Sequence, residues 1–217
     1  MTYIPSINIS LLIESIPYIL KGLPYTLVIS LSAFVIGNII GLFIAVLQIK
    51  ELFITKHFLK LYVSFLRGTP AIVLLFLLYF GMPIQLPPVT AAIICFSMTS
   101  SAFLSEIYRG AIKGIDSGQW EASKALGWSF AGTMIHIILP QSLRIAIPSL
   151  SNVAMDIIKG SSLAAMITVP DIFQRAKIVG GREFDFMTMY VLVAMIYWMI
   201  CILIEKLQHY LERKVAF

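Results

Sequence analysis

The sequence predicts an all-α protein that crosses a lipid bilayer with about five helices. Of its 217 residues, 59% are hydrophobic and only 12% are charged, and the mean hydropathy is +0.91. A soluble domain has roughly 25% charged residues, so this composition belongs in a membrane. The apolar runs are continuous over the ~20 residues that a spanning helix needs. A transmembrane β-barrel is excluded because its strands alternate apolar and polar residues.

The first residues of the chain do not read as a signal peptide. They lack a basic start, and Pro5 and Pro17 interrupt their apolar run. We expect residues 8–21 to form a short amphipathic helix that lies at the membrane interface and begins near Ser10.

Five apolar runs are predicted to span the membrane within a single transmembrane domain, residues 1–217. They cover residues 25–47, 58–80, 89–108, 149–169 and 187–204. In the first run, Gly37 and Gly41 form a small-residue face on which a second helix can pack closely. Cys95 and Cys201 lie inside apolar runs without a CxxC motif or a His cluster, so we interpret them as buried small side chains.

The second run contains Arg67, Gly68 and Pro70, which are costly inside a membrane. Pro70 is expected to break the helix at about Thr69. Irregular backbone at this depth is tolerated only inside protein or beside a watery cavity. The alternative is that Arg67 reaches the headgroups from near the start of its helix.

The third run carries a cluster of hydroxyl side chains, Ser97, Thr99, Ser100 and Ser101. Such hydroxyls bond a carbonyl one turn back or a neighbouring helix, or they line a polar pathway. At the end of this run Glu106 precedes Arg109 by three residues, so the two can pair across one helical turn.

The fourth run contains a second pair with the same spacing, Asp156 and Lys159. Charges inside a membrane helix usually have partners and face the interior of the helix bundle. The two side chains lie on one face of the helix, and we expect them to pair.

A polar island at residues 116–148 separates the third and fourth runs. Residues 119–126 are predicted to form a short helix, which Gly127 ends in the left-handed conformation. Ser129 is then placed to cap a second helix over residues 130–139, which Pro140 is expected to end. The small apolar face of the first helix suits insertion into a groove on a partner protein; it comprises Ala122, Ala125 and Leu126, flanked by Glu121 and Lys124.

The order Glu121-Ala122-Ser123, Gly127, Ile137, Leu139-Pro140 resembles the EAA loop of permease subunits of ATP-binding-cassette (ABC) importers, with Ser123 in place of the family's second Ala. The resemblance implies the type I ABC importer permease fold and a cytoplasmic coupling loop over residues 116–140. The residues that it assigns to ATPase coupling are Gln119, Glu121, Ala122, Ser123, Ala125, Leu126 and Gly127. The competing interpretation is an ordinary amphipathic loop between two membrane helices.

Two further strings resemble the polar amino-acid branch of these permeases, residues 62–70 (YVSFLRGTP) and 78–83 (LYFGMP). Residues 115–122 (IDSGQWEA), 162–165 (SLAA) and 196–198 (IYW) look most like the L-cystine permeases of that branch. The resemblance therefore implies an importer of L-cystine, with glutamine, histidine or arginine as the alternative substrates. An ATP-independent channel is a second class, although a channel has no use for a docking helix.

Six residues are candidates for the substrate pathway: Arg67, Thr69, Ser100, Asp156, Lys159 and Ser161. At residues 159–163 the chain reads KGSSL where the family typically has KDTSL, so the acidic residue is missing at Gly160. Our hypothesis is that Asp156, one turn earlier on the same face, supplies that charge to Lys159.

The distribution of Lys and Arg predicts an orientation. With the N-terminus outside and the C-terminus in the cytoplasm, the larger share of these residues, including those of the island, lies on the cytoplasmic side. The resemblance implies a location in a bacterial cell membrane.

The chain has no GxxxxGK[ST] loop for nucleotide phosphates, no HExxH and no GxSxG motif. It is therefore predicted not to be an enzyme and to bind no cofactor itself, with ATP and Mg²⁺ held by a partner ATPase. The partners that the resemblance implies are an ABC ATPase dimer, a second permease subunit (a second copy or a close paralogue), an extracytoplasmic amino-acid-binding protein and membrane lipid. No nucleic-acid partner is expected.

Overall fold

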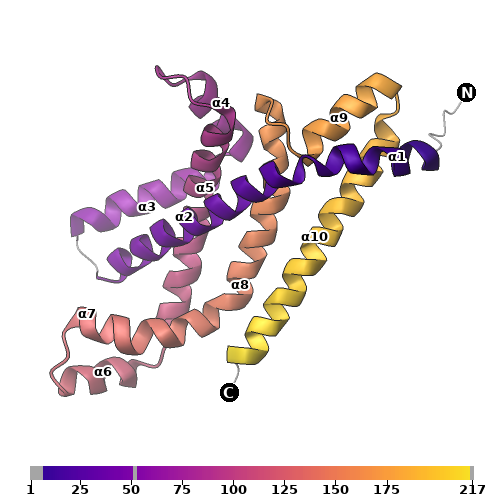
Figure 1. Ribbon diagram of the computed structural model, residues 1–217. Coiled ribbons are helices and arrows are strands. Elements are labelled where there is room, and N and C mark those ends of the chain that lie inside the picture. The colour runs from indigo at the N-terminus through magenta and orange to yellow at the C-terminus, as the bar shows by residue number, and fades with distance from the viewer. Residues whose placement is uncertain (1–6, 51–52, 216–217) are drawn as a thin grey trace, which may run out of the picture.

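A computed structural model describes residues 7–50 and 53–215, and all regular structure within these ranges is helical (Figure 1). The elements are α1 (Ile9–Leu20), α2 (Leu23–Ile49), α3 (Phe53–Gly68), α4 (Ala71–Phe80), α5 (Pro88–Lys113), α6 (Ser117–Ala125), α7 (Phe130–Thr133), a π-turn η1 (Met134–Ile138), α8 (Leu139–Gly160), a 3₁₀ helix η2 (Ser161–Ile167), α9 (Ile172–Glu183) and α10 (Phe186–Val215).

Four helical stretches are long and apolar enough to cross a membrane, and a bent pair makes a possible fifth crossing. The four are Leu23–Ile49, Pro88–Lys113, Phe130–Ile167 and Phe186–Lys214. The pair, His57–Gly68 with Ala71–Phe80, bends by 102°. The outer face of α2 carries a stripe of exposed apolar side chains, as expected for a helix in a membrane; it comprises Val28, Leu31, Val35, Ile39 and Phe43.

The bend between α3 and α4 confirms the break predicted at Pro70. Helix α3 ends at Gly68, and α4 begins directly after Pro70, whose ψ of 133° is extended. The Thr69 hydroxyl donates to the Phe65 carbonyl at 2.8 Å, which satisfies one of the acceptors freed at the helix end.

Among the described helices, α2 and α5 share the most extensive contact, and the predicted small-residue face lies within it. A Cβ atom on Gly37 would lie 2.2 Å from the Ser100 Oγ, and one on Gly41 would lie 2.8 Å from the Leu104 Cβ. The Tyr108 hydroxyl donates to the Asn38 Oδ1 at 2.5 Å and adds a polar contact between the same helices. Close approach of this kind replaces the hydrophobic drive that is absent in lipid.

One predicted helix boundary and one predicted helix cap were wrong. Pro140 does not end the helix that begins at Phe130, because the π-turn η1 intervenes and the Leu139 N–H donates to the Met134 carbonyl, five residues back. This wider turn shifts the hydrogen-bond register and leaves Pro140 in the first turn of α8, where a missing N–H is tolerated. At the N-terminus, Asn8 rather than Ser10 caps α1 by accepting from the Leu11 N–H at 3.1 Å.

The two ends of the bundle differ in what they carry (Figure 1). Helices α6 and α7 and the C-terminal end of α10 lie at one end, whereas α4, α9 and the N-terminal helix α1 lie at the other. The segment between α5 and α8 is therefore separated from α1 by the length of the spanning helices (Figure 1).

Candidate functional site

The α6–α7 elbow, residues 116–133, is stopped and restarted by local capping. The Asp116 Oδ1 accepts from the Gly118 N–H at 2.7 Å and begins α6. At the other end Gly127 has φ +75°, its N–H donates to the Lys124 carbonyl, and the Trp128 N–H donates to the Ser123 carbonyl. These two bonds make a Schellman motif. The Ser129 Oγ then accepts from the Gly132 N–H at 3.2 Å and caps α7.

Side-chain contacts hold the two arms of the elbow against each other. The hydroxyls of Ser123 and Thr133, which are 2% and 4% exposed, hydrogen-bond at 2.7 Å. The rings of Trp120 and Phe130 stack with their centroids 6.0 Å apart. The side-chain amide of Gln141, in α8, donates to the Gln119 Oε1 at 3.3 Å and ties α6 to that helix as well. The elbow is therefore a braced unit rather than a loose loop.

The outer surface of the elbow is apolar and open. Of the seven residues predicted to couple to an ATPase, six are exposed, and Ser123 alone faces inward. Leu126 is 78% exposed, and the exposed rings of Trp128 and Phe130 lie close to it in sequence. An exposed apolar patch of this kind is typical of a protein–protein contact.

The elbow is anchored to α5, the helix that precedes it. Met134 and Ile138 of the π-turn belong to the same buried cluster as Tyr108 and Ile112 of α5. Gly114 ends α5, and α6 begins three residues later. The elbow is therefore joined to α5 both by packing and by the chain itself.

A second candidate site is a cavity of about 780 Å³ between α3, α5 and the end of α2. It is lined by Gln48, Lys60, Val63, Ser64, Arg67, Gly68, Phe103, Glu106, Arg109 and Lys113. The Arg67 guanidinium lies over the Phe103 ring, 5.4 Å from its centroid. Arg67 thus faces a cavity, as the first of its two sequence interpretations required.

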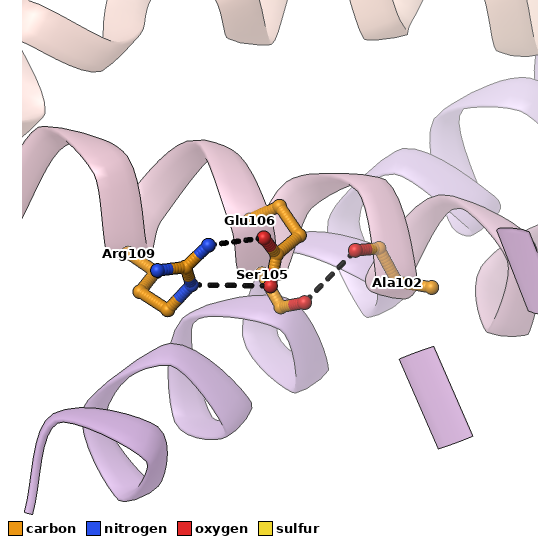
Figure 2. Close-up of polar contacts among 4 residues, drawn as sticks. All are labelled: Ala102, Ser105, Glu106 and Arg109. Carbon is orange, nitrogen blue, oxygen red and sulfur yellow. Dashed lines mark hydrogen bonds and ion pairs between the residues drawn. The ribbon is translucent and has the colours of Figure 1, made fainter. Parts of the chain in front are cut away.

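The predicted pair of Glu106 and Arg109 forms on the cavity wall (Figure 2). The Arg109 Nε donates to the Glu106 Oε1 at 3.2 Å, and its terminal nitrogen Nη2 forms an ion pair with the Glu106 Oε2. On the same helix, the Ser105 Oγ donates to the Ala102 carbonyl at 2.8 Å, so its proton is used in a hydrogen bond within α5.

The other predicted pathway residues do not converge on this cavity. Ser100 is buried and donates to the Ala33 and Ser97 carbonyls, and Ser161 is buried and donates to the Ile158 carbonyl. The Ser100 hydroxyl therefore joins α5 to α2, whereas the Ser161 and Thr69 hydroxyls bond carbonyls one helical turn earlier. The six candidates do not form one site.

Asp156 and Lys159 pair as expected, with 2.8 Å between the Lys159 Nζ and the Asp156 Oδ1. The expectation that they face the interior of the bundle was wrong for the single subunit. Their side chains are 72% and 56% exposed on α8. Since an ion pair is costly against lipid, we expect this face of α8 to meet water or protein.

Sequence reasoning missed Lys60 and Lys113 as cavity residues because both were assigned to polar flanks of the spans. The spacing carried a signal. Lys60, Ser64 and Arg67 recur at the period of one helix face on α3, and Glu106, Arg109 and Lys113 do so on α5.

Asp171 was also missed, and it is fully buried at the opposite end of the molecule. Its Oδ1 accepts from the Gln174 N–H at 2.7 Å and caps α9, while its Oδ2 has no hydrogen-bond partner among the described residues. Burial raises the pKa of this carboxyl to about 7. A Cβ atom on Gly22 would lie 2.3 Å from the Asp171 carbonyl carbon, so the α1–α2 junction packs directly on this segment.

Comparisons with known proteins show which family this chain resembles. Residues 37–217 match the family model described as "Binding-protein-dependent transport system inner membrane component". A probable amino-acid ABC transporter permease protein of Bacillus subtilis, YckA, is 54% identical over 212 residues, covering 96% of this chain and 94% of the relative. The L-cystine transport system permease protein TcyB of the same organism is 36% identical over 203 residues, covering 92% of this chain and 87% of TcyB.

Solved structures agree in fold. A chain of an amino acid ABC transporter crystallised with histidines has a TM-score of 0.87 at 30% identity, covering 96% of this chain and 99% of that one. A chain of the inward-facing MetNI methionine ABC transporter has a TM-score of 0.75 at 21% identity, covering 93% and 98%, and shows the fold alone.

Proposed function

The chain belongs to the family of binding-protein-dependent transport system inner membrane components and is the permease subunit of an amino-acid ABC importer, and we propose that its α6–α7 elbow is the part that receives the work of ATP hydrolysis. Such permeases are not enzymes, because the ATPase is a separate subunit. The importer family implies an ATPase partner and a substrate-binding protein.

The observation that carries this proposal is the braced, exposed elbow. Its Schellman motif and the bond between Ser123 and Thr133 hold α6 in one orientation, while Glu121 and Leu126 remain free to contact a partner. A docking helix must be rigid in this way, because a flexible one would absorb the displacement that it has to transmit.

The route from the elbow to the pathway runs through α5. This helix packs on the π-turn behind the elbow, and its Phe103, Glu106 and Arg109 line the cavity. Closure of the ATPases would move the elbow, tilt α5 and thereby change the cavity between an inward-open and an outward-open form. The chain is then a two-state element whose equilibrium is biased by the nucleotide state of its partner.

The proposed assembly has two permease subunits, either two copies of this chain or this chain and a close paralogue, above an ATPase dimer that holds ATP and Mg²⁺. The proposed orientation has the N-terminus outside and the C-terminus and the elbow in the cytoplasm of a bacterium. The excess of Lys and Arg on the elbow side supports this orientation.

The proposed substrate is a polar amino acid, with L-cystine first. The strings at residues 115–122, 162–165 and 196–198 and the likeness to TcyB support L-cystine. Glutamine, histidine and arginine remain the alternatives to be tested against it.

The experiment is substrate-stimulated ATP hydrolysis by the co-purified permease, ATPase and binding protein, measured across a panel of amino acids. We expect Glu121→Lys to abolish stimulation and to weaken retention of the ATPase. Glu14→Lys reverses the same charge on an exposed residue of α1 and should leave both unchanged. Uptake that continued without the ATPase would indicate a channel and refute the proposal.

A further inference from the structure

The cavity between α3 and α5 has an excess of positive charge. Four cationic side chains line it, and the only carboxylate among the lining residues is that of Glu106; the cations are Lys60, Arg67, Arg109 and Lys113. Lys60 and Arg67 line the cavity from α3, and Arg109 and Lys113 line it from α5.

The single carboxylate already has one cationic partner. Glu106 forms both an N–H···O bond and an ion pair with Arg109. Arg67 lies over the face of Phe103, and within residues 7–50 and 53–215 the structure gives it no ion pair. Lys60 and Lys113 likewise have no carboxylate partner within these ranges. Like charges without a carboxylate partner repel each other in a cleft, and the carboxylate groups of a ligand placed between them relieve that repulsion.

We propose that this cavity binds the transported amino acid and selects molecules that carry at least two carboxylates, such as L-cystine or L-glutamate, over cationic amino acids. The inference rests on the proposed function, since it names the substrate class of the same pathway. Arg67 would take one carboxylate in a bidentate fork. Lys60 and Lys113 would hold the second carboxylate as point charges.

The remaining features fit an amino acid as the ligand. Glu106 keeps lone pairs that can accept from an ammonium group, because a carboxylate offers about four acceptor positions. The volume of about 780 Å³ lies within the usual range for small-molecule sites. The backbone at Gly68, where α3 ends inside a predicted span, borders the cavity, and interrupted helices at this depth commonly line binding sites.

The charge balance predicts discrimination. Arginine has a net positive charge and one carboxylate, whereas cystine is net neutral and has two carboxylates. In a cavity that already holds three cations without a carboxylate partner, arginine should therefore bind much more weakly than cystine. Removing Arg67 should remove one charge-assisted fork, which corresponds to a loss of about 10- to 100-fold in affinity.

The test is direct binding of labelled L-cystine, L-glutamate and L-arginine to the assembled permease–ATPase complex in nanodiscs, without the binding protein. This omission matters because the binding protein would impose its own preference. We expect cystine and glutamate to bind, arginine to bind at least ten-fold more weakly, and Arg67→Gln to weaken the first two. Arg67→Glu should shift the preference toward arginine. Lys21→Gln, an exposed cation outside the cavity, is the matched control and should change nothing.

Three outcomes would overturn the inference. Arginine could bind as tightly as cystine, or Arg67→Gln could leave cystine and glutamate binding intact. The third outcome combines two measurements. Mass spectrometry of nanodiscs with and without anionic lipid could show that Arg67 retains a lipid phosphate, while the amino acids bind equally to the wild type and to Arg67→Gln. The importer function would survive all three, since stimulation of ATP hydrolysis with the binding protein present is measured separately.

Discussion

The hydroxyl pair that joins α6 to α7 predicts how stiff the elbow is. Ser123 and Thr133 are both buried and bond each other at 2.7 Å across ten residues of chain. Ser123→Ala removes one partner and leaves the Thr133 Oγ1 buried without it. A buried polar group deprived of its partner costs about 1–3 kcal/mol. Thr133→Val should cost a similar amount, because it leaves the Ser123 hydroxyl buried without its partner.

The double variant Ser123→Ala/Thr133→Val separates this bond from simple loss of packing. It removes both polar groups together, so no unsatisfied hydroxyl remains, and it should be close to the wild type in stability. Since the double variant should cost close to nothing, the coupling energy in the double-mutant cycle should equal the sum of the two single-variant costs, about 2–6 kcal/mol, at or above the upper end of the range found for residues in direct contact.

Two assays on the assembled transporter report the effect. The thermal midpoint should fall by about 2–4 °C per kcal/mol in each single variant, the scale for a chain of this size. Amino-acid uptake per ATP hydrolysed should fall as well, because a loosened elbow dissipates movement before it reaches α5. Single variants that match the wild type in both assays, or a double variant that loses the sum of the two single effects, would refute the bracing role.

Two further predictions concern one backbone position and one buried carboxyl. Gly127→Ala should destabilise the elbow by about 1–2 kcal/mol through its φ of +75° alone, since nothing lies within 4 Å of an added Cβ. The control is Gly110→Ala, where an added Cβ also meets open space but the backbone is that of helix α5. It should be neutral or slightly stabilising in the same thermal assay. Burial raises the pKa of Asp171 from 3.8 to about 7, so the folded protein favours the neutral carboxyl. The stability that this preference adds is complete below about pH 4 and is lost as the pH rises through 7. The thermal midpoint of the wild type should therefore fall between pH 5 and pH 8, whereas Asp171→Asn should flatten that part of the profile; an unchanged slope would contradict the assignment.

Several features of the site could be predicted because their causes are local. The helix over residues 119–126, its stop at Gly127 and its restart at Ser129 follow from capping chemistry that acts over three or four residues. The break at Pro70 follows from a ring that cannot donate a hydrogen bond. The stop expected at Pro140 failed by the same kind of argument, since the five-residue register of the π-turn accommodated the ring and nothing local in the sequence announced it.

Composition and short-range stereochemistry thus determined the spanning helices and the elbow, and the resemblance of residues 121–140 to the EAA loop indicated the family. Tertiary structure alone decided which side chains meet. It buried Ser100 against α2, left Asp156 on an open face of α8, and brought Arg67 of α3 to Glu106 of α5. The physical reason is that burial and the gathering of charge depend on where helices cross, and those crossings are set by packing between residues far apart in the chain.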